Sequence, residues 1–221
     1  GMITQIVEQL SAGNIYLMLL ITAIASLLIG MGLPTTATYI VMASLTAPII
    51  VNVGGANGFI VPLMAAHLFC FYFGILADDT PPVGLASYAA AALARSDPIP
   101  TGIQGFMYDI RTSILPFMFI FNSDLILHNI NSWPLGIMIF ITACIGTCSF
   151  ASATQGWFVT KNKWYELIIL LLATLIMFRP DLVAQYITLP SKYLAYLIGI
   201  AILAGVYMLQ KRRLVREEAA A

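Results

Sequence analysis

The chain has 221 residues, of which 60% are hydrophobic and only 9% are charged, whereas an ordinary soluble domain is about 45–50% apolar and about 25% charged. Positions 9–77 contain no Asp, Glu, Lys or Arg. Such a stretch cannot form a water-exposed surface, and the lipid bilayer is its natural solvent. This hydrophobic composition excludes a cytosolic enzyme and a disordered chain. The net charge of zero and the absence of a basic run before the C-terminal region exclude a nucleic-acid-binding protein.

The first 14 residues predict an amphipathic connector. Apolar residues repeat at the spacing of one helix face between residues 3 and 10, with polar residues on the opposite face. The residues on the apolar face are Ile3, Ile6, Val7 and Leu10. Small and turn-forming residues at 11–14 then end this helix.

Residues 15–29 form a continuous apolar run that is too short to cross a bilayer, since a helix rising about 1.5 Å per residue reaches about 22 Å of the ~30 Å hydrocarbon core. The run stops at the sequence GMGLPTT (30–36), and a second apolar run follows at 37–53. Two short helices around a Gly/Pro/Thr break are typical of a re-entrant hairpin, here over residues 15–54. One long kinked span, or two thin spans joined by an ordinary turn, also fit these residues.

Residues 59–77 form a third apolar run, which is long enough to cross the bilayer. It ends in the sequence DDTPPVG at 78–84, and a helix of small residues follows at 85–94. Two consecutive prolines cannot continue a helix, because each lacks an N–H donor and clashes with the preceding turn. The pattern fits a broken transmembrane helix over residues 57–95 whose freed carbonyls coordinate an ion, and it also fits a plain loop after a complete span.

The rest of the chain predicts an interfacial helix and four further crossings. Residues 99–114 place an apolar stripe opposite polar side chains such as Asp109, so this helix should lie in the membrane interface with Asp109 solvated. With a scaffold helix at 114–127 it forms a segment over residues 97–130. A C-terminal extension of three helices with a basic tail covers residues 133–221. Its crossings are predicted at 134–159, 164–178 and 193–209, with Trp and Tyr residues near their ends as interfacial anchors.

The basic residues set the orientation of these crossings. If the hairpin opens outward and the broken helix crosses inward once, eight of the ten Lys and Arg residues lie in the cytoplasm with the C-terminus. One full crossing over residues 15–53 would reverse every later loop. The charge bias therefore favours the hairpin over one long span, whereas two thin crossings would preserve the assignment. The eight basic residues are Arg95, Arg111, Lys161, Lys163, Lys211, Arg212, Arg213 and Arg216.

Four motifs occur in one order: GMGLPTTATYI at 30–40, HLFCFYFG at 67–74, TPPVGLASYA at 80–89 and DPIPTG at 97–102. Together they resemble the large membrane subunit of tripartite ATP-independent periplasmic (TRAP) transporters, of the fused permease type, over about residues 1–130. The remaining helices resemble the extension that follows the core in fused permeases. Because only one hairpin and one break are found, we expect the chain to correspond to the C-terminal portion of such a permease, which should not transport alone.

The resemblance implies an elevator-type secondary carrier, in which a mobile transport domain carries substrate and sodium past a fixed scaffold. The expected fold is an all-α integral membrane protein: half of an elevator-type ion-transporter fold with a re-entrant hairpin, a broken helix, an interfacial arm helix and additional C-terminal transmembrane helices. The implied partners are a periplasmic solute-binding protein, the small TRAP membrane subunit or its fused equivalent, the N-terminal half of the permease and the lipid bilayer. The implied location is the bacterial or archaeal cytoplasmic (inner) membrane. No cofactor is expected beyond sodium as the coupling ion.

The resemblance also assigns site residues, because in such carriers the hairpin tip and the helix break face each other and offer oxygen ligands to sodium, a hard cation. The residues assigned to ion binding are Gly30, Gly32, Pro34, Thr35, Thr36, Asp79, Thr80 and Pro81. The residues assigned to substrate binding are Thr35, Thr36 and Thr80. Thr35 and Thr36 also suit the cap of the second hairpin helix. No catalytic residue and no metal other than sodium is expected.

Three ionisable residues need a separate interpretation. Asp78 and Asp79 depart from the family pattern, in which uncharged residues usually precede Thr-Pro-Pro; each fits a cation ligand, a proton-coupled site or, as the favoured interpretation, a charge at the water-facing end of the helix. His67 lies on the third apolar run, where a functional role is the default, although a neutral histidine bonded to a neighbouring helix is the commoner outcome and the one expected.

These observations predict the membrane permease portion of a binding-protein-dependent, sodium-coupled and ATP-independent secondary transporter that imports small organic anions such as carboxylates. Two alternatives stay open: a proton-coupled carrier that uses Asp78 or Asp79, and an integral membrane subunit or enzyme without a transport role. An enzyme needs a catalytic constellation. His67 and the two aspartates would lie more than ~15 Å apart on a continuous helix, so no enzymatic activity is expected.

Overall fold

The computed structural model describes residues 11–81, 83–109, 112–128, 130, 132–188 and 191–220. For residues 217–220 only the backbone is described. All regular secondary structure in these residues is helical, as predicted for an all-α membrane protein. The chain divides into two compact units, residues 1–128 and 129–221, and each is described by itself. The amphipathic helix predicted at residues 3–10 lies outside the described residues.

Unit 1 begins with a helical hairpin, α2 (Ile15–Gly30) and α3 (Thr35–Ala56). Asn14 caps α2, because its side-chain oxygen accepts hydrogen bonds from the backbone N–H groups of Tyr16 and Leu17. α2 has 16 residues and α3 has 22. α3 is longer than the predicted run at 37–53, since the threonines before this run and the glycines after it join the helix. The hairpin arms are therefore unequal, and α3 alone is long and apolar enough to cross a membrane.

The third apolar run begins its helix later than predicted. α4 (Leu63–Leu76) starts after Pro62, whose backbone is extended (φ −62°, ψ 141°), so residues 59–62 stay outside the helix. α4 has 14 residues, which corresponds to about 21 Å. The helix therefore begins four residues later than the apolar run at 59–77.

The helix stops where the proline motif predicts. A short 3-10 helix, η1 (Ala77–Asp79), follows α4, and the backbone becomes extended at Thr80 (φ −80°, ψ 120°). Gly84 adopts a left-handed conformation (φ 38°) directly before α5 (Leu85–Ala94), a conformation that glycine tolerates without a steric cost. Residues 80–84 thus separate two helices, as expected of two consecutive prolines.

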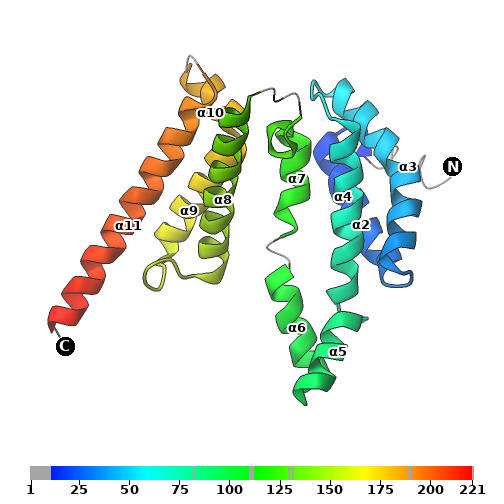
Figure 1. Ribbon diagram of the computed structural model, residues 1–221, viewed down its shortest axis with the longest axis horizontal. Helices are drawn as coiled ribbons and strands as arrows, with labels where there is room; N and C mark the ends of the chain where they lie inside the picture. The colour runs from blue at the N-terminus through cyan, green and yellow to red at the C-terminus, as the bar shows by residue number, and fades with distance from the viewer. Residues whose placement is uncertain are drawn as a thin grey trace. The chain divides into compact units, whose positions relative to one another are not determined.

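α4 is the central helix of unit 1 and contacts α2, α3 and α7 (Ile114–Phe121) (Figure 1). The rings of Phe69 and Phe73 both pack edge to face on Phe117, with centroid distances of 5.2 and 5.6 Å. On the hairpin side, a Cβ atom at Gly54 of α3 would lie 2.5 Å from the side chain of Val61, so only glycine fits this approach. Val61 lies just before α4, so this approach fixes the end of α3 against the segment that leads into α4.

α6 (Pro98–Asp109) lies beside α5, beyond the end of α4 (Figure 1). The Asp97 carboxylate accepts a hydrogen bond from the backbone N–H of Ile99, in the first turn of the helix. Ile103 and Met107, which belong to the predicted apolar stripe, are 53% and 52% exposed. An amphipathic helix with an exposed apolar stripe suits the membrane interface, in line with the sequence expectation.

α7 has only 8 residues. It ends because Asn122 leaves the helical conformation (φ −141°, ψ 88°) and its side chain accepts a hydrogen bond from the backbone N–H of Asp124. A short 3-10 helix, η2 (Ser123–Ile126), follows. The segment predicted at 114–127 is therefore interrupted at Asn122.

Unit 2 contains α8 (Trp133–Gln155), α9 (Trp164–Phe178), α10 (Pro180–Ile187) and α11 (Leu194–Ala220). α9 contacts both α8 and α11, and the Ser149 hydroxyl of α8 donates a 2.9 Å hydrogen bond to the carbonyl of Leu170 in α9. α9 and α10 are bent by 93°, because the residue before Pro180 is driven out of the helical conformation. The predicted crossings at 134–159 and 193–209 correspond to α8 and α11, whereas the crossing at 164–178 is one arm of this bent pair.

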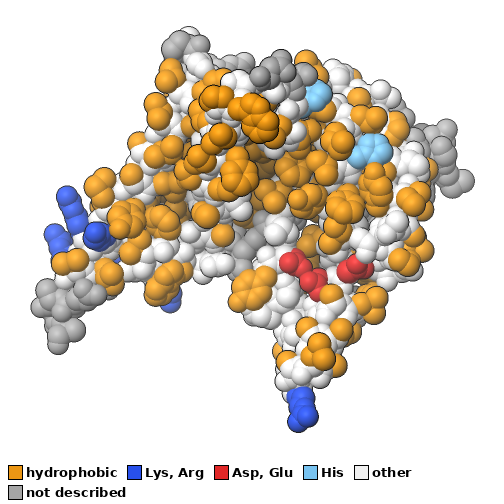
Figure 2. Space-filling model, viewed as in Figure 1, with side chains coloured by type: hydrophobic (Ala, Val, Ile, Leu, Met, Phe, Trp, Pro, Cys, Tyr) orange, Lys and Arg blue, Asp and Glu red, His pale blue; other side chains and the backbone are white. Residues whose placement is uncertain are grey.

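Among the described residues, three helices are long and apolar enough to cross a membrane: α3, α8 and residues 194–216 of α11. The bent pair of α9 and α10 adds a fourth possible span. Hydrophobic side chains are spread over the face seen in Figure 2, where few charged side chains appear, and Trp133 at the start of α8 is 88% exposed. Such a surface is stable in lipid and not in water, so the chain is a multi-pass all-α membrane protein.

Candidate binding site at the hairpin tip

The hairpin tip is a tight turn between the end of α2 and the start of α3. The backbone N–H groups of Met31 and Gly32 bond to the carbonyls of Leu27 and Ile29, each at 3.1 Å. Pro34 precedes α3 with an extended backbone (φ −58°, ψ 147°), and its carbonyl accepts the first helical bond of α3 from Thr38 at 3.0 Å. Proline suits this place because its φ angle is already fixed near the required value.

Gly30 brings this tip into close contact with the end of α4. A Cβ atom at Gly30 would lie 2.4 Å from the Cβ atom of Ala77 and 3.4 Å from both the Gly74 carbonyl oxygen and the Thr38 side chain. No side chain larger than hydrogen fits unless the helices separate. The hairpin tip and the first part of the helix break are therefore packed against each other.

Thr35 joins the two elements by a hydrogen bond. Its hydroxyl donates to the carboxylate of Asp78 at 2.5 Å, across 43 positions of sequence. α3 has no side-chain cap, so the Thr35 hydroxyl serves the contact with η1 in place of the cap that the sequence also allowed. A charge-assisted bond of this kind is about twice as strong as one between neutral groups.

A pocket of about 500 Å³ lies beside this bond. Its lining residues are Gly30, Met31, Gly32, Leu33, Pro34, Thr35, Asp78, Val83, Leu85 and Ala86. The pocket thus combines the tip, the helix break and the first turn of α5. It offers a carboxylate, a hydroxyl and backbone groups in a mainly apolar surrounding, which is the usual composition of a small-ligand site.

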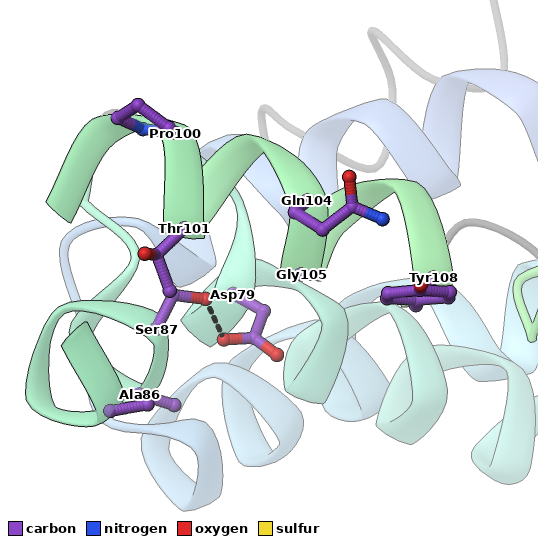
Figure 3. A pocket seen from close by; sticks show the side chains of 9 residues that line it. Asp79, Ala86, Ser87, Pro100, Thr101, Gln104, Gly105 and Tyr108 are labelled. Carbon is purple, nitrogen blue, oxygen red and sulfur yellow. Dashed lines mark hydrogen bonds between the residues drawn. The ribbon is translucent and has the colours of Figure 1, made fainter. Parts of the chain in front are cut away.

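Asp79 points into a different space. Its carboxylate accepts a 2.6 Å hydrogen bond from the hydroxyl of Ser87 in α5, and it lines a second pocket of about 650 Å³ between α5 and α6 (Figure 3). Gly105 allows α6 to come this close, since a Cβ atom there would lie 2.8 Å from the Ser87 hydroxyl oxygen. Asp79 is thus absent from the lining of the tip pocket, although its neighbour Asp78 is part of it.

Asp109 at the end of α6 completes this second polar group. Its carboxyl is hydrogen-bonded to that of Asp79. Burial, together with the neighbouring Asp79 carboxyl, raises the pKa of Asp109 to about 6. Two carboxyls can hydrogen-bond to each other only when one carries a proton, so the pair can hold a proton. Asp109 was expected to be solvated; the structure shows it half-buried and beside Asp79.

The remaining predicted site residues lie around the tip pocket without lining it. The buried Thr80 hydroxyl donates to the carbonyl of Leu76 at 2.7 Å and closes the last turn of α4. Pro81 lies toward α6, 3.8 Å from the position of a Cβ atom at Gly102. Thr36 is exposed on the first turn of α3. The structure therefore brings Gly30, Gly32, Pro34 and Thr35 together with Asp78, and it separates them from the other four residues.

His67 hydrogen-bonds to a neighbouring helix, as expected: its Nδ1 atom lies 3.0 Å from the hydroxyl of Tyr39 in α3. Sequence reasoning missed Ser87 and Asp109 as partners of Asp79 and treated Asp78 chiefly as a helix end. The two glycines of α6, Gly102 and Gly105, were the available signal, since glycines spaced by three residues allow close helix approach.

The fold and this site define a class: a multi-pass membrane protein in which a helical hairpin tip and a helix break line one pocket that carries a carboxylate and a hydroxyl, an arrangement typical of secondary transporters. The comparisons give the family. The family model described as "Tripartite ATP-independent periplasmic transporter, DctM component" matches residues 1–134, and the chain belongs to this family. Residues 136–193 match "Domain of unknown function (DUF3394)". No curated protein and no solved structure matches the chain. The recognition made from the four motifs is confirmed: the protein is a TRAP-type membrane permease component.

Proposed function

We propose that this permease imports small organic anions such as carboxylates together with sodium, without ATP, and that the tip pocket holds the ion and part of the substrate. The observation that carries the proposal is the hydrogen bond between Thr35 and Asp78. This bond joins the hairpin tip to the helix break at the wall of one pocket, and it makes the geometry of both elements depend on the same group.

The negative C-terminal end of one helix and the positive N-terminal end of another both lie at this pocket. α2 ends at Gly30, where the negative end of its helix dipole lies, and α3 begins at Thr35, where the positive end of its dipole lies. The carbonyl end and the Asp78 carboxylate suit sodium, whereas the N–H end suits a substrate carboxylate.

The charge of Asp78 links the two ligands. Two like charges about 4 Å apart repel each other by roughly 4 kcal/mol near a protein surface. A carboxylate substrate therefore binds well beside Asp78 only when a cation neutralises that residue. Sodium bound between the tip and Asp78 would supply this cation, and substrate binding would then depend on sodium.

In this proposal a periplasmic solute-binding protein delivers the substrate, and the small TRAP membrane subunit or a fused equivalent completes the scaffold with the N-terminal half of the permease. The chain would lie in the cytoplasmic membrane of a bacterium or archaeon with its C-terminus in the cytoplasm, since eight of ten basic residues then lie inside. The chain would act as a carrier and not as an enzyme.

Proton coupling is the second candidate function. It is favoured by the hydrogen-bonded carboxyls of Asp79 and Asp109, which connect the helix break to α6. A proton held there during one half of the transport cycle and released in the other would replace sodium as the coupling ion. In this mechanism Asp78 would be dispensable, whereas Asp109 would not.

The experiment is uptake into proteoliposomes by the permease that contains this chain, with its binding protein and a radiolabelled carboxylate that the binding protein retains. Asp78→Asn and Thr35→Val should each raise the sodium concentration for half-maximal uptake by roughly 10-fold or more. Ser44→Ala, on the exposed side of α3, serves as the matched control and should leave it unchanged. Full wild-type uptake in sodium-free medium would reject sodium coupling. Loss of uptake in Asp109→Asn, with uptake retained in Asp78→Asn, would support the proton mechanism instead.

A further inference from the structure

One end of unit 2 contains a buried polar network that joins α9, α11 and the loop at 156–163. Glu166 is 2% exposed, and its carboxylate accepts hydrogen bonds from Arg213 Nη1 at 3.0 Å and Gln210 Nε2 at 2.9 Å. Gln210 is fully buried, and its side-chain oxygen accepts hydrogen bonds from the backbone N–H groups of Val159 and Thr160. These bonds fix the start of α9 against the end of α11.

Arg213 donates four hydrogen bonds within this network. Besides Glu166, its guanidinium donates to the Thr160 hydroxyl at 2.7 Å and to the Lys161 carbonyl at 2.9 Å. Its charge is offset by Glu166, from which it lies 3.0 Å away. Arg213 and Glu166 thus form a neutral, rigid wall for anything bound beside them.

A pocket of about 320 Å³, here called the basic pocket, lies against this wall. Its lining residues are Lys163, Tyr165, Glu166, Leu209, Arg212, Arg213 and Arg216. After Arg213 and Glu166 cancel, the lining retains the three exposed cations Lys163, Arg212 and Arg216. Lys and Arg side chains also gather near this end of α11 in Figure 2. Three like charges converging on one pocket favour an anionic ligand.

The surroundings of the basic pocket indicate the kind of anion. Arg212 and Arg216 offer the planar donor groups that match phosphate oxygens. Trp164 and Leu209, next to the cations, are 77% and 56% exposed, and Tyr165 lines the pocket itself. Aromatic and apolar side chains beside cations are typical of the lipid headgroup level. A free phosphate ion would leave this apolar surface uncovered, whereas a phospholipid would cover it.

We propose that the basic pocket binds the anionic phosphate headgroup of a membrane phospholipid, with the acyl chains continuing past Leu209 into the bilayer. Bound in this way, anionic lipid would anchor the basic end of unit 2 to the membrane. The inference does not depend on which ion or substrate the permease carries.

The test uses the permease that contains this chain, delipidated in a neutral detergent, and compares phosphatidylglycerol, phosphatidylcholine with the same acyl chains, and inorganic phosphate. Lipid bound per chain is measured by native mass spectrometry, and thermal unfolding is followed in parallel. Phosphatidylglycerol should bind with roughly 10-fold higher affinity than phosphatidylcholine and should raise the unfolding temperature, whereas inorganic phosphate should do neither at the same concentration. Equal binding of the two lipids would overturn the proposal, and equal protection by inorganic phosphate would overturn its assignment to a lipid.

Variants locate the site. Arg212→Gln combined with Arg216→Gln should lower phosphatidylglycerol affinity roughly 10- to 30-fold without disturbing the network around Glu166. Lys211→Gln is the matched control, because Lys211 lies on the same helix and points over the ring of Tyr207, outside the basic pocket. It should change the affinity less than 2-fold. Equal losses of affinity in the double variant and in Lys211→Gln would mean that the lipid is attracted by the overall positive charge of this end and not bound in the basic pocket. The comparison of lipids on the wild-type chain decides the question even if a variant fails to fold.

Discussion

Replacement of Gly30 by alanine tests the contact on which the candidate site depends. The added Cβ atom would lie 2.4 Å from the Cβ atom of Ala77, whereas two such carbons are comfortable at about 3.5–4.0 Å. The nearest atom is a methyl group attached to helical backbone, so it cannot rotate away. The tip and α4 must therefore separate by roughly 1 Å or more.

The structure sets the size of the effect. Overpacking of this kind costs about 1–3 kcal/mol of folding free energy. The same displacement would lengthen the bond between Thr35 and Asp78 from 2.5 Å to beyond about 3.5 Å, where it no longer counts as a hydrogen bond. A hydrogen bond to a charged group contributes about 1.5–3 kcal/mol. If sodium binding requires this arrangement, its apparent affinity should fall roughly 10-fold or more.

The assay compares three variants by thermal unfolding and by the sodium concentration for half-maximal uptake. Gly30→Ala should lower stability and sodium affinity together. Gly55→Ala places a Cβ atom on the same hairpin where nothing lies within 4 Å, so it should leave uptake unchanged and gain up to about 1 kcal/mol of helix propensity. Adding Ala77→Gly to Gly30→Ala removes the clashing methyl group and should restore most of the sodium affinity. The reasoning fails if Gly30→Ala behaves like Gly55→Ala, or if the double variant recovers nothing.

Three further outcomes follow from the structure. The pKa of Asp109 is raised to about 6. Its contribution to stability is therefore complete below the ordinary pKa of about 4 and is lost as the pH rises through about 6. Thermal unfolding between pH 4.5 and 7.5 should show this loss in the wild type and not in Asp109→Asn. Glu166→Ala leaves the mostly buried Arg213 unpaired and should lower the free energy of unfolding, measured with denaturant, by about 3 kcal/mol or more. Lys192→Ala breaks a 3.9 Å surface pair with Asp181 and should lower it by less than about 1 kcal/mol. Equal losses would contradict the buried network. Asn14→Ala removes the cap of α2 and should cost about 1 kcal/mol, with Asn14→Ser largely restoring it.

Local chemistry explains why the sequence could place the tip and the helix break. Glycine and proline act within one or two residues, by permitting or forbidding particular backbone angles. The GMGLPTT and TPP motifs therefore predicted a turn at 30–36 and an interruption at Thr80, and the helices stop at both. At residues 59–77 and 114–127 the helices are shorter than the apolar runs, because hydropathy alone does not mark where a helix begins or ends. Pro62 delays the first helix and Asn122 ends the second.

The neighbouring aspartates show what local chemistry could not decide. Asp78 and Asp79 are adjacent in a 3-10 helix, where successive side chains point about 120° apart because each turn holds three residues. One therefore meets Thr35 at the hairpin tip and the other meets Ser87 beside α6. The sequence shows that two acids precede the prolines, but it does not show which of them faces which partner.

The sequence by itself thus determined the solvent, the helical class, the family and the two interruptions, because hydrophobicity and backbone restriction are properties of short segments. Only the tertiary structure decided the pairing of Thr35 with Asp78, of Asp79 with Asp109, and of Glu166 with Arg213. Each of these contacts joins residues 30 or more positions apart in the sequence. Such a pairing depends on how helices rotate and slide against each other, and that is set by the close packing of the entire unit around its glycines and aromatic rings.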